Sequence, residues 1–270
     1  SLSHAVGDGR TYYEVFNMLQ PGAEVRKLST LRVMAFSESM RDLCGRRELE
    51  WVETPSALCI MMCAISPSMF GCGRAPKCYA FELDADRLAA AKAKGAESGE
   101  APYVTTNDIL TSAFFNECRT RVGLMGMDCR GRVPGVEENM AGNYVTALVM
   151  DPDTYASPGT VRKMLSSTPF QTTGRPLPAC AAYCCGFESG KSAMVTNWAS
   201  FAGGLVQLES CELALHLPVV NPASCVFDLM IPFASGKGKV GVLCWTISTD
   251  EGGLREALPV GESISKELFP

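Results

Sequence analysis

The sequence predicts a mixed α/β fold. Segments with helical spacing of apolar residues are interspersed with segments of strand-like alternation, and there is no internal repeat or low-complexity tract. The 270 residues, 47% of them hydrophobic and 20% charged, suffice for one large or two moderate domains. The longest apolar run, Ala57–Ala64, is shorter than the ~20 residues of a bilayer span, so a membrane-spanning role is not expected. The formal net charge of −5 leaves no basic face for nucleic acid.

The first elements lie in the N-terminal 53 residues. Ser1–Ala5 is typical of a strand end and Gly7-Asp8-Gly9 of a turn, followed by a helix over Thr11–Leu19 whose apolar positions follow helical spacing. A second helix is predicted over Ser37–Arg47, and Arg46–Glu53 is predicted to be an exposed connection.

A loop rich in Gly, Cys and Pro, Pro67–Pro76, predicts a crossover between two parts of the chain. We therefore expect one unit over residues 1–75 and a second over residues 76–270. The second begins with a strand over Cys78–Leu83 and a helix over Asp84–Lys94 that ends at Gly95.

A strong helix is expected over Thr105–Arg121, with Thr106 as its N-cap. Val122–Val133 alternates as a strand, which would place Asp128, Arg130 and Arg132 on one face. The later elements are strands over Tyr144–Met150, Ala193–Trp198, Cys211–Leu217, Cys225–Pro232 and Lys239–Ile247, a helix over Thr160–Ser167 and a hairpin turn at Gly236-Lys237-Gly238.

The thirteen cysteines are an odd number, and Cys59, Cys63, Cys225 and Cys244 sit in apolar runs. Buried free thiols fit this pattern better than a disulfide framework, which favours an intracellular, reducing compartment. The sequence has no C-x-x-C and only two histidines, so we expect no metal site.

The most distinctive motif is H-x-x-x-D-G, formed by His4, Asp8 and Gly9. A histidine where a strand ends can point its imidazole into a cleft, and an unperturbed pKa near ~6.5 suits it to take a proton from an alcohol or amine. Asp8 lies beyond the tight turn and is expected to pin the loop. The alternative is that His4 has a structural role only.

Five stretches resemble, in order, the BAHD-type acyl-CoA-dependent acyltransferases, which have the chloramphenicol-acetyltransferase-like fold. His4–Leu19 is similar to their H-x-x-x-D-G segment and Val104–Arg121 to their T-x-N-D-x-L helix. The other matching stretches are Phe81–Ala93 (the helix after the crossover), Met127–Val145 (D-x-R-x-R-x-P and G-N) and Thr196-Asn197-Trp198 (T-S-W).

The resemblance implies that His4 is the general base and that acyl-CoA is a co-substrate, with no permanently bound cofactor. It implies that Asp8 pairs with an arginine, either Arg130 or Arg132, which with Gly9 supports the site. Thr196 and Trp198 match side chains whose donors lie near the tetrahedral oxyanion.

These residues also have plainer interpretations. Arg130 and Arg132 could instead form a solvated strand face, and Trp198 could be ordinary core.

The chain departs from the family in two places. The D-F-G-W-G motif is absent where Ala202–Glu209 should carry it, and no substantial segment precedes His4. The resemblance therefore implies a remnant of the N-terminal half of the fold followed by a complete C-terminal half. We expect an upstream segment or a second protein chain to complete it.

Gly186–Ser192 is similar to a phosphate-binding loop, but it has three residues between its glycines instead of four and precedes a predicted strand, which argues against nucleotide hydrolysis.

Two functions remain open at this point. The first is acyl transfer from a CoA thioester to a hydroxyl or amine, with His4 as base. The second is a non-catalytic scaffold or accessory subunit of a large complex, a possible pseudoenzyme, which the short N-terminal part and the Met- and Cys-rich run Leu58–Phe70 favour. Either would lie in the cytoplasm, or in an organelle after removal of an upstream segment.

Overall fold

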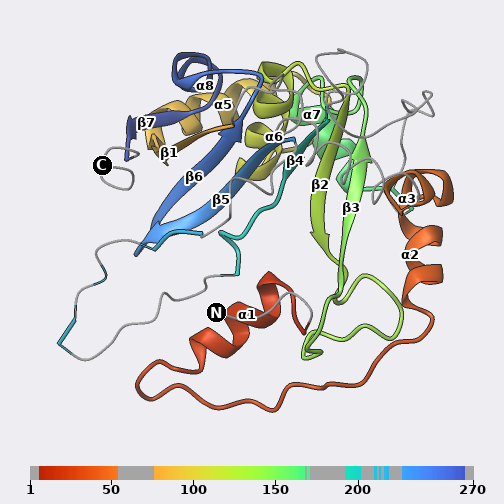
Figure 1. Ribbon diagram of the computed structural model, residues 1–270. Coiled ribbons are helices and arrows are strands. Elements are labelled where there is room, and N and C mark those ends of the chain that lie inside the picture. Colours follow the sequence, from red (N-terminus) through yellow and green to blue (C-terminus); the bar gives the residue numbers. More distant parts are fainter. Residues whose placement is uncertain are drawn as a thin grey trace, which may run out of the picture.

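The computed structural model describes residues 6–53, 76–167, 169–170, 192–201, 210–211, 213, 216–218 and 227–264. Its centre is one seven-stranded sheet with the strand order β3-β2-β4-β5-β6-β1-β7, covered by helices (Figure 1). The predicted mixed α/β class is confirmed. The strands are β1 Lys77–Leu83, β2 Val122–Asp128, β3 Val145–Met150, β4 Ser192–Val195, β5 Asp228–Gly236, β6 Lys239–Thr246 and β7 Val260–Ser263.

The helices of the described residues fall into two groups. The N-terminal group is α1 Gly9–Asn17, α2 Phe36–Cys44 and α3 Arg46–Glu53. The second group is α5 Ala85–Glu97, α6 Thr106–Glu117, α7 Pro158–Leu165 and α8 Glu251–Ala257. α6 contacts α5, α7 and α8 and supplies Leu110, Phe114 and Phe115 to the main core, where they meet the inward residues of the strands. No helix within the described ranges is both long and apolar enough to cross a bilayer.

The strands alternate between two apolar clusters because successive side chains point to opposite faces. In β5, Met230 belongs to the main core with the helices, whereas Leu229 and Ile231 belong to a second cluster on the other face. β6 repeats this pattern with Cys244 and Leu243. The hairpin predicted at Gly236-Lys237-Gly238 joins β5 to β6, and Gly238 has the φ of +70° that favours glycine there.

The middle of the sheet is parallel and sets the position of the site. β4 pairs in parallel with both β2 and β5, with Met125 opposite Val195 and Val195 opposite Met230. The carboxyl ends of β2 and β4 therefore meet at one edge. Figure 1 shows α1 (red) beneath this edge, beside the loop that joins β2 to β3.

One predicted strand is too long. The strand expected over Val122–Val133 ends at Asp128, and the following residues turn: Gly131 has φ +68° and its amide donates to the Val136 carbonyl. Asp128, Arg130 and Arg132 therefore do not share one face of a strand, because only Asp128 belongs to β2. Arg130 is buried at 4% exposure, whereas Arg132 is exposed.

Three predictions are wrong around the helices, and two elements near the C-terminal end of the described residues were not predicted. Arg46–Glu53 is a helix instead of an exposed connection, and its Leu49 is buried. Thr105, not Thr106, caps α6 through a capping box with Asp108. Gly95 lies inside α5, where a Cβ would meet Val104 at 2.8 Å. α8 and β7 were not predicted.

Several expectations fall partly or wholly outside the described residues. These are the strand end at Ser1–Ala5 with His4, the crossover loop before Pro76, the segments Leu58–Phe70 and Ala202–Glu209, the glycine-rich run before Ser192, and Cys59, Cys63 and Cys225. A strand was expected over Cys211–Leu217, but the described residues of that range do not form one.

Candidate functional site

The site begins at Asp8, which is the N-cap of α1. Its Oδ1 accepts the Thr11 backbone N–H at 2.9 Å, which satisfies one of the free amides at the start of the helix. Oδ2 accepts the Tyr144 backbone N–H at 2.9 Å, from the start of the strand region after the β2–β3 loop. Asp8 is only 2% exposed, so the start of α1 is fixed against that loop.

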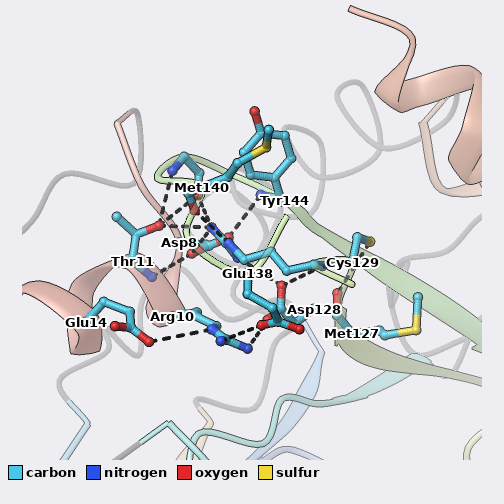
Figure 2. A network of polar contacts seen from close by, with 12 residues as sticks. Asp8, Arg10, Thr11, Glu14, Met127, Asp128, Cys129, Glu138, Met140 and Tyr144 are labelled. Atoms are coloured by element: carbon cyan, nitrogen blue, oxygen red, sulfur yellow. Dashed lines mark hydrogen bonds and ion pairs between the residues drawn. The ribbon is translucent and has the colours of Figure 1, made fainter. Parts of the chain in front are cut away.

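Arg130 is the ionic partner of Asp8. Its Nη1 and Nη2 donate to the two carboxylate oxygens at 2.9 and 3.2 Å. Both side chains are 1% exposed. Figure 2 shows the polar contacts around Asp8. Nη1 also donates to Asp128 at 2.9 Å, and Nε donates to the Met140 carbonyl at 2.7 Å. Of the two arginines that the resemblance offered, Arg130 therefore contacts Asp8, while Arg132 makes no such contact.

The loop between β2 and β3 folds around this guanidinium. Nη2 of Arg130 also reaches the Thr11 hydroxyl and the Gly142 carbonyl, each at 3.0 Å. Gly142 has φ +140°, a conformation that side chains rarely adopt, and the Tyr144 ring lies 5.3 Å from the guanidinium carbon. Every N–H group of the Arg130 side chain donates to the protein, so this arginine has a structural role and no N–H is left to bind a ligand.

Both members of the pair stay charged at neutral pH. Burial alone would raise the pKa of Asp8, but hydrogen bonds from Arg130, Thr11 and Tyr144 and the charge of Arg130 outweigh burial and leave that pKa below its ordinary value. Burial likewise opposes the charge of Arg130, and the carboxylates of Asp8 and Asp128 more than compensate and raise its pKa.

A second arginine extends the network toward the surface. Arg10 Nη1 donates to the other oxygen of Asp128 at 3.0 Å, and its Nη2 donates to Glu138 at 2.7 Å (Figure 2). Asp128 is thus shared between Arg10 and Arg130.

Thr196 and Trp198 follow the end of β4 and prolong its pairing with β5. The Thr196 amide donates to the Met230 carbonyl at 3.1 Å, and the Trp198 amide to the Pro232 carbonyl at 2.8 Å. The Trp198 indole Nε1–H donates to Thr196 Oγ1 at 3.1 Å. The indole donor is therefore occupied, whereas the Thr196 hydroxyl hydrogen has no acceptor among the described residues and remains to donate.

Two cavities lie at this edge of the sheet. The first, the Trp198 cavity, has a volume of about 450 Å³ and is lined by residues that include Gly9, Thr196, Trp198 and Phe201. The second, the arginine cavity, has a volume of about 570 Å³ and is lined by residues that include Arg10, Arg130, Arg132 and Arg162. Both volumes are in the range of small-molecule sites. The residues that line both are Gly126, Met127, Asp128, Asn197 and Phe201.

Gly126 and an amide pair shape the wall that the cavities share, and sequence reasoning missed both. A Cβ on Gly126 would lie 3.0 Å from Thr196 Oγ1, so the strand approaches Thr196 closely because this residue has no side chain. The Asn197 side-chain amide donates to Asn107 Oδ1 at 3.0 Å, which joins the end of β4 to the first turn of α6. Asn107 and Asn197 were each within matched motifs, but nothing in the sequence indicated that they meet.

A tyrosine–histidine pair borders the site and was also missed. Tyr13 of α1 is 2% exposed, and its hydroxyl lies 3.1 Å from His216 Nε2. His216 Nδ1 lies 2.8 Å from the Ala234 carbonyl, which can only accept, so Nδ1 donates in this contact. Burial raises the pKa of Tyr13. The Tyr13 ring also packs against Trp198, with centroids 6.5 Å apart.

His4 lies outside the described residues, so its side chain is not placed relative to Thr196. Within the described ranges, no cluster of three or more His, Cys, Asp or Glu side chains is arranged to hold a metal ion.

Fold and site together define a mixed α/β protein in which a buried Asp–Arg pair fixes an N-terminal helix beside two adjoining cavities. No protein-family model matches the sequence, and no curated protein matches it. Its structure is similar to that of vinorine synthase, at 13% identity and TM-score 0.48, over 96% of this chain and 60% of that one.

Two further solved structures are similar. TRI101 of F. sporotrichioides in complex with coenzyme A and T-2 shares 16% identity, with TM-score 0.46 over 93% and 60% of the two chains. The first condensation domain of the CDA synthetase shares 12%, with TM-score 0.45 over 94% and 59%. None of these scores reaches 0.5, so the similarity by itself assigns neither a family nor an activity. The present chain spans about 60% of the length of these structures.

Proposed function

We propose that this chain transfers an acyl group from an acyl-CoA thioester to the hydroxyl or amine of an acceptor. The observation that carries the proposal is the pair of cavities that share a wall at Gly126, directly beside the Thr196 hydroxyl. A reaction between two bound molecules needs two such spaces that meet at one point. The order of the five motifs along the sequence supports the same function.

The arginine cavity suits an anionic donor. Arg10, Arg130 and Arg162 line it and are paired with carboxylates, whereas Arg132 is exposed and forms no ion pair with a carboxylate among the described residues. The phosphates of coenzyme A are anionic, and a guanidinium binds phosphate oxygens through a planar pair of donors. We assign phosphate contact to Arg132 and the acceptor to the Trp198 cavity.

In the proposed reaction, the imidazole of His4 takes the proton of the acceptor hydroxyl or amine as that atom attacks the thioester carbonyl carbon. The carbonyl oxygen becomes an oxyanion, and the Thr196 hydroxyl donates to it. Collapse of the tetrahedral intermediate breaks the carbon–sulfur bond and expels the CoA thiolate, which takes the proton from the imidazolium. Trp198 acts on this step through Thr196, because its indole N–H is already donated to Thr196 Oγ1.

Asp8, Gly9 and Arg130 are positioning residues in this proposal. His4 lies four positions before Asp8, whose backbone is fixed, so a start of α1 held by Arg130 limits where the imidazole lies. Arg132, which the sequence offered as an equal alternative, is placed with the donor instead.

The proposed partner is an upstream segment or a second chain that covers the N-terminal unit, residues 1–75. Six large apolar side chains of residues 6–34 are strongly exposed: Val6, Val15, Leu19, Val25, Leu31 and Met34. Their exposure leaves apolar area in this part of the chain that a partner could cover. The same surface favours the second candidate function, a scaffold or accessory subunit without turnover.

Turnover separates the two functions. Release of the CoA thiol from an acyl-CoA is measured for the full chain with a panel of alcohols and amines. We expect His4→Ala to abolish release and Thr196→Val to lower kcat about 100-fold, the effect of one oxyanion donor. His216→Gln, which changes the other histidine, is the matched control and is expected to retain turnover.

Turnover that persists in His4→Ala would refute the assigned base. A chain that releases no thiol with any acceptor, yet forms a stable complex with a partner chain, would establish the scaffold function instead.

A further inference from the structure

The Trp198 cavity has a predominantly apolar wall. Its large side chains come from α2, α3, β2, β4 and the segment after β4, namely Met40, Leu49, Met127, Met194, Trp198 and Phe201. Three of these six are methionines, whose polarisable sulfur packs well against aromatic and aliphatic groups. Such a wall stabilises a ligand by removing its apolar surface from water.

Each charged side chain among the described residues that line the cavity has an oppositely charged partner. Among the described residues that line it, only Asp8 and Asp128 are ionised, and both belong to the arginine network. Asp8 is matched by Arg130, and Asp128 receives Arg130 on one oxygen and Arg10 on the other, at 2.9 and 3.0 Å. Both carboxylates therefore have guanidinium partners, and Arg10 is shared further with Glu138 at 2.7 Å, so neither guanidinium is available to an anionic ligand.

A charged ligand would therefore lose its hydration, at a cost in binding free energy, without gaining an oppositely charged partner. A carboxylate would meet two carboxylates, and an ammonium would have to compete with arginines already in hydrogen-bond contact.

The polar groups that remain are neutral hydroxyls. Asn197 lines the cavity, but its amide donates to Asn107 and its oxygen accepts the Ala199 backbone N–H at 2.9 Å. Thr196 keeps its hydroxyl hydrogen, and the Thr146 hydroxyl has no hydrogen-bond partner within the part of the chain that the structure describes. One or two hydroxyl contacts match a single neutral polar group on a ligand.

From this lining we infer that the Trp198 cavity selects uncharged, largely apolar alcohols or phenols and rejects ligands that carry a carboxylate or an ammonium group. The inference deepens the proposed function, on which it rests for the role of the ligand as acyl acceptor. The chemical class follows from the charge balance and the apolar wall of this chain, and binding alone tests it.

The test compares three ligands that share one ring system. They are 2-naphthylmethanol, 6-(hydroxymethyl)-2-naphthoate and 6-(aminomethyl)-2-naphthylmethanol, titrated into the full chain by isothermal calorimetry at pH 7.5. We expect the neutral alcohol to bind and both charged analogues to bind at least about 30-fold more weakly, because each would bury an unpaired charge.

A charge-reversal variant sharpens the comparison. Met194→Lys places an ammonium in the cavity wall, so we expect the naphthoate to become the tightest of the three ligands. Met34→Lys makes the same change at a residue that is 92% exposed and lies outside the cavity, and it is expected to keep the wild-type order. Circular dichroism establishes that each variant folds, and the wild-type comparison stands by itself if Met194→Lys does not.

The inference is overturned if the naphthoate or the ammonium analogue binds as tightly as the alcohol, or if none of the three binds. Selective binding of the alcohol without any release of CoA thiol would refute the acyltransferase proposal and leave the ligand class intact. Thiol release without selective binding would do the opposite.

Discussion

Asp8→Asn tests the buried Asp–Arg pair. The substitution keeps a side-chain oxygen that caps α1 through the Thr11 amide, since asparagine and aspartate are equivalent N-caps. It removes the negative charge and replaces Oδ2, which accepts from Arg130 Nη1 and from the Tyr144 backbone N–H, by an NH2 group. The expected loss of stability therefore combines the lost charge with the lost acceptor for these two donors.

The magnitude follows from the geometry. Two unit charges about 4 Å apart attract by about 4 kcal/mol at an effective dielectric constant of about 20, and removing one partner of a buried pair costs about 3–5 kcal/mol. Arg130 keeps Asp128 at 2.9 Å, which places the expected loss near the lower end, about 3 kcal/mol. Both Asp8 and Arg130 side chains are 1% exposed, so solvent does not screen this contact.

Urea unfolding followed by circular dichroism measures the loss. Asp84→Asn is the matched control, because Asp84 caps α5 through the Arg87 amide at 2.9 Å without a buried arginine, and we expect it to change stability by less than about 0.5 kcal/mol.

The pH dependence has a definite sign. Since the pKa of Asp8 is lowered in the folded protein, its contribution is complete above the unfolded value of ~3.9 and is lost as the pH falls through the folded value. The difference between wild type and Asp8→Asn should be constant from pH 7 to about pH 5 and shrink below ~3.9. A loss no greater than that of Asp84→Asn, or a difference that does not shrink in acid, would refute the reasoning.

Two further predictions concern packing and thiol reactivity. Gly123→Ala would place a Cβ 2.4 Å from the Phe115 ring and should destabilise by about 1–3 kcal/mol in urea unfolding, whereas Gly261→Ala, whose Cβ would meet its nearest neighbour at 3.8 Å, should be nearly neutral. Equal effects of the two would contradict the packing in β2. Burial raises the pKa of Cys129 to about 12, so at pH 8 iodoacetamide should label exposed Cys211 well before Cys129 in site-resolved mass spectrometry, and labelling in the reverse order would show that Cys129 is accessible.

The sequence predicts best what neighbouring residues determine. The helix around Thr106–Glu117 and the hairpin at Gly236–Gly238 follow from local spacing and turn chemistry, and both are present. The end of β2 was mispredicted because the residues after Asp128 alternate as they would in a strand. The turn around Gly131 depends instead on backbone hydrogen bonds to Val136 and Tyr144, which the alternation does not reveal.

Contacts between distant residues were beyond local reasoning. The motif resemblance offered Arg130 and Arg132 equally as the partner of Asp8. The turn after β2 decides between them, because it buries Arg130 and exposes Arg132. Tyr13 and His216 are 203 positions apart, and no pattern in either segment indicates that they meet. The charge balance of the Trp198 cavity likewise emerges only when Asp128 is seen between Arg10 and Arg130.

The dependence of α1 on Arg130 also determines which part of the molecule unfolds locally first. A nine-residue helix is too short to persist alone in water, so α1 is helical only while its start is held 122 positions away along the chain. We therefore expect its amides to exchange with solvent as one cooperative unit, before those of the central strands. Because Asp8 and Gly9 also line the Trp198 cavity, a ligand in that cavity should slow this exchange, which makes the α1 amides a reporter of occupancy that requires no turnover.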